Sequence, residues 1–247
     1  MLMLGGCRGH MHPPLAGPHG PYRVQQTVTL RPADVGDARL ELLEDARITP
    51  SIRAVFQRGL PDDACADSPA DSLRAFCAAI VRRPLLPALL RLIDGHGTPL
   101  DSVPLERSIG DIVLAIPASG ARPAVFGVSV DLSAEAGSYS GPLLQLLDPR
   151  DRRLRWLRAR DVASDSTVDV FLPTTLKTGW KIIPADGGAG PEILLVACRP
   201  AFGENGSDFK ITYTRFFMER GGWRRVQRTV PGFWENEGDF PVRSLFP

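Results

Sequence analysis

Three acidic residues close to the end of the chain could form a site for acid and base chemistry. Glu235, Glu237 and Asp239 lie in the stretch PGFWENEGDFP, which also contains Phe233, Trp234 and Phe240. Glycoside hydrolysis needs two carboxyl groups, and aromatic rings offer flat surfaces to a sugar. We interpret the three acids as candidate catalytic groups, and Phe233 and Trp234 as candidate binding residues. The alternative interpretation is structural: the rings seal a sheet edge while the acids face water.

A run of arginines around Trp156 is a second candidate surface. It consists of Arg150, Arg152, Arg153, Arg155, Arg158 and Arg160. Arginine interleaved with aromatic residues can bind phosphate or stacked bases, so Arg155 and Trp156 are candidate binding residues. On a strand, Arg153 and Arg155 would instead share the solvent face, opposite Leu154 and Trp156. The net charge of the whole chain is only +1, which argues against nucleic acid as a partner.

Other patterns of catalysis and cofactor binding are missing from the sequence. Beyond the first 21 residues the chain has one histidine, His96, in the turn-like stretch IDGHGTP. The stretch GSYSG has tyrosine where a nucleophile elbow has serine, and Gly238 is misplaced for a calcium loop of the EF-hand type. The sequence therefore favours a protein that is not an enzyme, and it predicts neither a cofactor nor a metal site.

The cysteines suggest a disulfide bond. Cys65 and Cys77 are close enough in sequence to close a short loop if the protein is exported to an oxidising compartment. Cys198 lies in the apolar run EILLVACRP and is expected to be a buried free thiol. Cys77 could equally be a reduced core residue of a helix.

The beginning of the chain suggests where in the cell the protein is located. Leu4-Gly5-Gly6-Cys7 resembles the lipobox of bacterial lipoproteins. In that family a signal peptidase cleaves before the cysteine, which then carries lipid, so the resemblance implies lipidation of Cys7. The stretch after Cys7 is rich in glycine and proline, as expected of a tether. Two alternatives are a metal-binding arm and an incidental terminus. The residues of such an arm would be Cys7, His10, His12 and His19.

The elements that position these residues divide the chain into three parts. Residues 1–21 are expected to be a flexible tether or signal remnant. Residues 22–107 begin with a strand at Tyr22 and then predict helices over 33–48, 50–60 and 70–97, the last interrupted by Pro84 and Pro87. Residues 108–247 contain many short β-favouring segments, including an alternating hairpin over 208–230. The expected fold class is α+β: a small helical N-terminal part followed by a mainly antiparallel β-sandwich or barrel-like body.

These features predict a binding or structural module of the bacterial cell envelope, periplasmic, anchored to the outer membrane or secreted. Its partner would be an envelope protein or a glycan, and it would touch a membrane only through the lipid on Cys7. The sequence contains no run of about 20 apolar residues that could cross a bilayer. Two alternatives are an exported glycan hydrolase that uses the C-terminal acids, and a cytosolic structural protein without an anchor.

Overall fold

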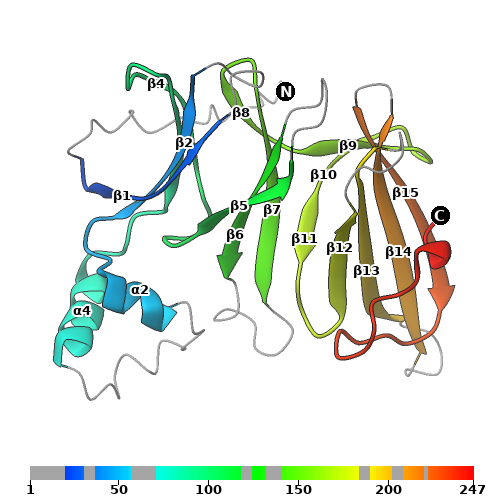
Figure 1. Cartoon of the computed structure of the whole chain (residues 1–247). Coiled ribbons are helices and arrows are strands. Elements are labelled where there is room, and N and C mark those ends of the chain that lie inside the picture. Colours follow the sequence, from blue (N-terminus) through cyan, green and yellow to red (C-terminus); the bar gives the residue numbers. More distant parts are fainter. Residues whose placement is uncertain are drawn as a thin grey trace, which may run out of the picture.

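Three β-sheets pack as successive layers in this protein (Figure 1). The computed structural model describes residues 20–30, 37–56, 71–117, 124–131, 141–183, 190–201, 208–219 and 222–247. In chain order we call the layers the N-terminal, middle and C-terminal sheets. Apolar clusters lie between the N-terminal and middle sheets, between the middle and C-terminal sheets, and on the outer face of the C-terminal sheet. The prediction of a β-rich fold is confirmed.

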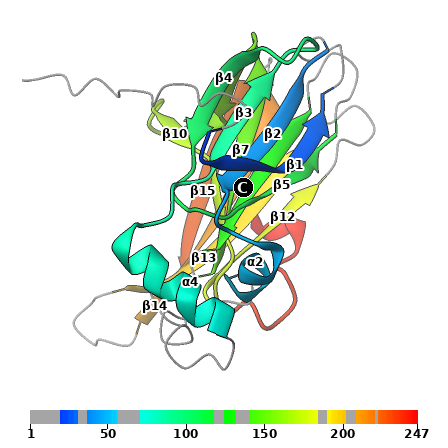
Figure 2. The same ribbon diagram turned by 90° about the vertical axis from the view of Figure 1, so that its left-hand side faces the viewer.

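The N-terminal sheet is an antiparallel meander of four strands. Its strands are β1 (Tyr22–Thr29), β2 (Arg39–Asp45), β3 (Leu89–Ile93) and β4 (Pro99–Pro104). Figure 2 shows this sheet in front, with the helices α2 (Pro50–Phe56) and α4 (Asp71–Arg82) at one end of it. These are the only α-helices in the part of the chain that the structure describes.

The expectation of a mainly helical part over 22–107 is therefore wrong. The helix predicted over 33–48 is replaced by β2, where Leu40 and Leu42 alternate with Glu41 and Leu43 on opposite faces. Both faces of β2 are buried, which hides the alternation in the sequence. The second helical piece predicted after Pro87 is β3, a fully buried strand of five residues. An apolar run this short suits a buried strand better than a helix.

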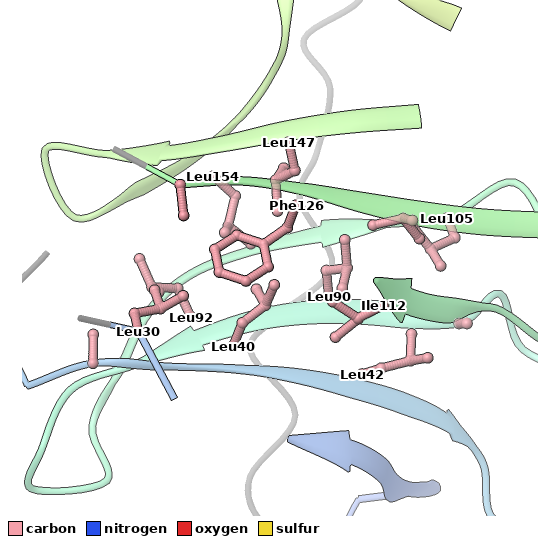
Figure 3. Close-up of a cluster of buried hydrophobic side chains, with 14 of the residues drawn as sticks. Leu30, Leu40, Leu42, Leu90, Leu92, Leu105, Ile112, Phe126, Leu147 and Leu154 are labelled. Carbon is pink, nitrogen blue, oxygen red and sulfur yellow. The ribbon is translucent and has the colours of Figure 1, made fainter. Parts of the chain in front are cut away.

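The central strands of the middle sheet are buried on both faces. The sheet contains β5 (Asp111–Ile116), β6 (Val125–Asp131), β7 (Pro142–Arg150) and β11 (Phe171–Pro173), and β8 (Arg153–Trp156) pairs with one end of β7. Phe126 and Leu147 belong to the cluster on the side of the N-terminal sheet (Figure 3). Leu144 and Leu146 belong to the cluster on the opposite side. A strand enclosed in this way is apolar almost throughout, as the stretch LLQLL of β7 is.

The C-terminal sheet has six strands. They are β9 (Arg158–Asp161), β10 (Thr167–Asp169), β12 (Thr178–Ile183), β13 (Glu192–Ala201), β14 (Asp208–Glu219) and β15 (Gly222–Pro231). All neighbours are antiparallel except β9 and β15. The predicted hairpin is confirmed by the pairing of β14 with β15, and Ile211 and Tyr213 share the outer face as expected. The opposite face of β14 is not fully exposed to solvent, because Thr214 is buried there.

Side chains close the N-terminal and middle sheets against each other at both edges. At one edge the Gln26 amide of β1 donates to Ile112 O of β5 (2.7 Å) and accepts from Ile112 N (2.8 Å). At the other edge the Asp101 carboxylate of β4 accepts a hydrogen bond from Leu154 N of β8 (2.8 Å). The backbone groups of the facing strands thus find partners without a further strand, and the two sheets form a barrel-like sandwich.

A buried ion pair fixes α2 to this sandwich. Glu44 of β2 is fully buried, and the Arg53 guanidinium of α2 lies 3.2 Å from its carboxylate. Arg53 also donates to Gly110 O (2.7 Å) and to the Asp111 carboxylate (2.9 Å). Burial raises the pKa of Glu44, although the charge and hydrogen bonds of Arg53 oppose this. Loss of Arg53 would leave a carboxylate in an apolar layer, so this contact determines where α2 lies.

A second ion pair fixes the end of α4. The Asp45 carboxylate accepts hydrogen bonds from the Arg47 guanidinium (2.6 Å) and from Leu86 N (3.0 Å). Arg47 also donates to the carbonyl oxygens of Arg83 and Pro84, which directly follow α4. Burial opposes ionisation of Asp45, but these hydrogen bonds outweigh it and lower its pKa from 3.8 to about 2.

We expect Asp45→Asn to remove an acid-sensitive part of the stability. A carboxyl group whose pKa is lowered by folding stabilises the native state above its unfolded pKa, and this contribution disappears as the pH falls through the folded value. Here the window runs from pH 4 down to about pH 2. At pH 7 the variant should lose about 2 kcal/mol in urea unfolding, and its stability should depend less on pH within that window.

Asp239→Asn is the matched control, because Asp239 is exposed and has no bonded partner among the described residues. It should change the free energy of unfolding by less than about 0.5 kcal/mol. Equal effects of the two substitutions would show that the Asp45 network does not stabilise the fold.

Candidate functional site

The C-terminal segment that carries the candidate acids lies against the outer face of the C-terminal sheet. Figure 1 shows it in red, running from β15 along this sheet to the short helix η2 (Arg243–Leu245). Phe240 and Phe246 stack on each other, and Phe246 meets Tyr213 of β14 edge to face, with 5.3 Å between the ring centroids. Arg243 donates to the Glu192 carboxylate of β13 (2.7 Å). The segment is therefore an integral layer of the fold.

Lys177 organises the first part of this segment. It lies in the turn before β12, forms an ion pair with Glu235 and places its ammonium group 3.6 Å from the centroid of the Phe233 ring. Phe209 of β14 completes the group: its ring meets Phe233 edge to face, with a centroid distance of 5.0 Å. A cation over an aromatic face is attractive, and more so when it is partly desolvated. The Lys177 side chain is only 14% exposed.

Trp234 packs closely on the sheet beside this group. A Cβ atom at Gly179 of β12 would lie 2.9 Å from the Trp234 ring, so only glycine allows the ring to sit there. The indole N–H of Trp234 is buried and has no hydrogen-bond partner among the described residues. The chain after Trp234 is held by a hydrogen bond from Asn236 N to Leu176 O (2.8 Å). Trp234 thus serves as a packing residue, while Phe233 keeps 55% of its surface exposed.

The structure does not join the three candidate acids into one group. Glu235 is engaged by Lys177, whereas Glu237 and Asp239 are exposed and form no hydrogen bond or ion pair within the described ranges. Acid and base catalysis would require two carboxyl groups facing one substrate. The arrangement instead agrees with the structural interpretation of this segment, in which the aromatic rings cover the sheet. Lys177 lies in no recognisable motif and was not predicted as a site residue, although it is one of only three lysines in the chain.

Arg155 and Trp156 belong to a different layer of the molecule. Trp156 packs against the cluster between the N-terminal and middle sheets, whereas Trp234 packs on the outer face of the C-terminal sheet. The predicted binding residues therefore do not form one surface. Arg153 and Arg155 are exposed and Leu154 is buried, as expected for an amphipathic strand.

The turn between β7 and β8 has an unusual backbone. The strands pair up to Arg150 and Arg153, so Asp151 and Arg152 form a two-residue turn. Both have positive φ angles, 53° and 59°, in a turn where Asn-Gly or Asp-Gly is preferred. A left-handed conformation costs a residue with a Cβ atom about 1 kcal/mol or more. Arg152 thus occupies a position where glycine would be less strained.

The cysteines partly follow the predictions. Cys198 is free and buried under the C-terminal segment, as expected. Cys77 lies on α4 and is disulfide-bonded. Cys65, its predicted partner, lies outside the described residues, as do Cys7, His10, His12 and His19. The Cys65–Cys77 pairing and the lipidation of Cys7 therefore stay predictions.

Two further kinds of site can be assessed in the described ranges. No group of three or more His, Cys, Asp or Glu side chains there has the geometry to hold a metal ion. His96 is exposed in the turn between β3 and β4, next to Asp94, which accepts hydrogen bonds from His96 N and Thr98 N. Among the described helices, none has the length and apolar character of a membrane span.

Comparison with protein-family models, curated proteins and solved structures finds no significant match to this chain. No relative therefore indicates a function for it.

We expect Lys177→Met to loosen the C-terminal segment. The substitution keeps a flexible apolar stem but removes both the ion pair to Glu235 and the cation over Phe233. It should lower the free energy of unfolding by about 1–2 kcal/mol, measured in urea by tryptophan fluorescence.

Lys181→Met is the control. Lys181 also belongs to the β12 region, but it is exposed and has no bonded partner in the described part of the chain. A loss of stability as large as that of Lys177→Met would contradict the role given to Lys177.

Proposed function

We propose that this protein is an exported component of the bacterial cell envelope, anchored through lipid on Cys7, and that its β-rich body is a binding module without catalytic activity. The observation that carries the proposal is the disulfide bond of Cys77. Disulfide bonds persist in the periplasm and outside the cell, whereas the cytosol keeps thiols reduced. In a cytosolic structural protein, Cys77 is expected to be a reduced thiol.

The lipobox-like start agrees with the same compartment. A lipid on Cys7 would place the body beyond a Gly- and Pro-rich stretch, which suits a tether. Anchoring by one or more lipid chains needs no membrane-spanning helix.

The contacts of the acids support a role in binding over one in hydrolysis. Glu235, the candidate acid that is partly buried, is held by Lys177 and contributes to packing. The face that carries it is covered by the rings of the protein's own C-terminal segment. We therefore expect the partner to bind elsewhere on the body.

Expression of the gene with its native upstream region, followed by cell fractionation, tests this proposal. The wild-type protein should appear in the membrane fraction with a lipid-modified N-terminal Cys7, and Cys7→Ser should abolish the lipid. After blocking of free thiols, proteolysis should release a peptide pair linked through Cys65 and Cys77 that separates on reduction.

The control is Cys198→Ser, which should change neither the fraction nor the linked peptides, because Cys198 is a free thiol. An unmodified N-terminus in the cytosol, with Cys65 and Cys77 both reduced, would contradict the proposal.

A further inference from the structure

The tip of the β7–β8 hairpin concentrates positive charge at one place on the body. Residues 148–155 contain four arginines and two aspartates. The side chains of Arg152 and Arg155 are 65% and 60% exposed, and Arg153 is exposed as well. Arg153 and Arg155 lie on the same face of β8, about 7 Å apart along the strand. Arg152 is directly before them in the turn.

The guanidinium groups of this tip form no hydrogen bond with the described residues, although two of them form long ion pairs. Arg152, Arg153 and Arg155 donate no hydrogen bond within the described ranges. Arg152 forms an ion pair with Asp94 at 3.9 Å, and Arg155 forms one with Asp151 at 3.8 Å; both distances are longer than a hydrogen bond. On β9, by contrast, Arg158 donates to Asp169 at 2.9 Å, and Arg160 donates to Asp165. The hairpin arginines therefore keep their donors free for a ligand.

The hairpin is also held rigidly. Leu154 lies in the cluster between the N-terminal and middle sheets, and its N–H donates to Asp101 of β4. Trp156 packs against the same cluster. Because the backbone is fixed on both sides of Arg155, binding an anion orders only the side chains. Guanidinium groups suit this task, since their fork of donors matches paired anionic oxygens.

We propose that Arg152, Arg153 and Arg155 form a binding site for a polyanionic glycan, one that carries carboxylate or phosphate groups. This proposal rests on the proposed function and specifies the partner of the binding module. The ligand bonds to the side chains by charge-assisted hydrogen bonds and forms no covalent link.

The surroundings of the three arginines favour this ligand over other anions. Trp156 is partly buried against the apolar cluster and is not a fully exposed ring on which bases could stack. No large apolar side chain of the hairpin is exposed in the described structure, so the tip lacks a group that would insert into a membrane. A protein partner would also need an apolar centre for its interface. A hydrated chain of charged sugars requires only the arginines.

Calorimetric titration of the full chain with polygalacturonate oligosaccharides tests the proposal. The double variant Arg153→Gln/Arg155→Gln should bind about tenfold more weakly than the wild type. The control Arg158→Gln/Arg160→Gln removes the same charge from β9, where both arginines already bond to aspartates. Its affinity should stay within about twofold of the wild type. Circular dichroism should show both variants folded.

Three results would overturn the proposal: no binding by the wild-type protein, equal losses in the two double variants, or binding of single-stranded DNA of equal charge as tight as that of the glycan. These results are measured on the purified protein and do not depend on its location in the cell. Failure of the glycan site is thus distinguishable from failure of the envelope proposal, which cell fractionation decides.

Discussion

The fold depends on burying both faces of the middle sheet. Phe126 and Val128 of β6 and Leu144 and Leu146 of β7 are all less than 6% exposed, although they divide between two clusters. Central strands enclosed in this way keep their backbone groups bonded within the ladder, and solvent reaches the sheet only at its edges, where Val113 and Phe171 are exposed. The N-terminal sheet meets it on one side and the C-terminal sheet on the other. The C-terminal segment then covers the outer face of the C-terminal sheet.

Burial on this scale explains how the arginines are used. Glu41, Glu44 and Asp45 of β2 are at least 95% buried, and each carboxylate has an arginine partner: Arg91, Arg53 and Arg47, respectively. A buried charge without a partner would be strongly destabilising, and a guanidinium satisfies several acceptors at once. The arginines of the β7–β8 hairpin differ because their donors are free. Arginines thus stabilise the interior at one set of positions and offer a ligand surface at another.

Sequence patterns predicted the parts of the fold that are buried on one face or bounded by clear signals. The alternation in β14 predicted its hairpin with β15, and the first helix before Pro84 is found as α4. β2 and β3 were mistaken for helices because strands buried on both faces lose their alternation and keep leucines at helix-like intervals. The ion pair of Lys177 with Glu235 joins residues far apart in the chain, which no local period reveals. The separation of Trp156 from Trp234 likewise follows only from the order of the layers.

Native-state hydrogen exchange tests the central role of the middle sheet most directly. If the other layers depend on it, the backbone amides of Val128 in β6 and Leu146 in β7 should exchange only through global unfolding. Their opening free energies should then equal the free energy of unfolding measured with urea. If these amides exchange faster than those of Tyr213 and its neighbours in β14, the C-terminal sheet is stable by itself. That result would contradict the account.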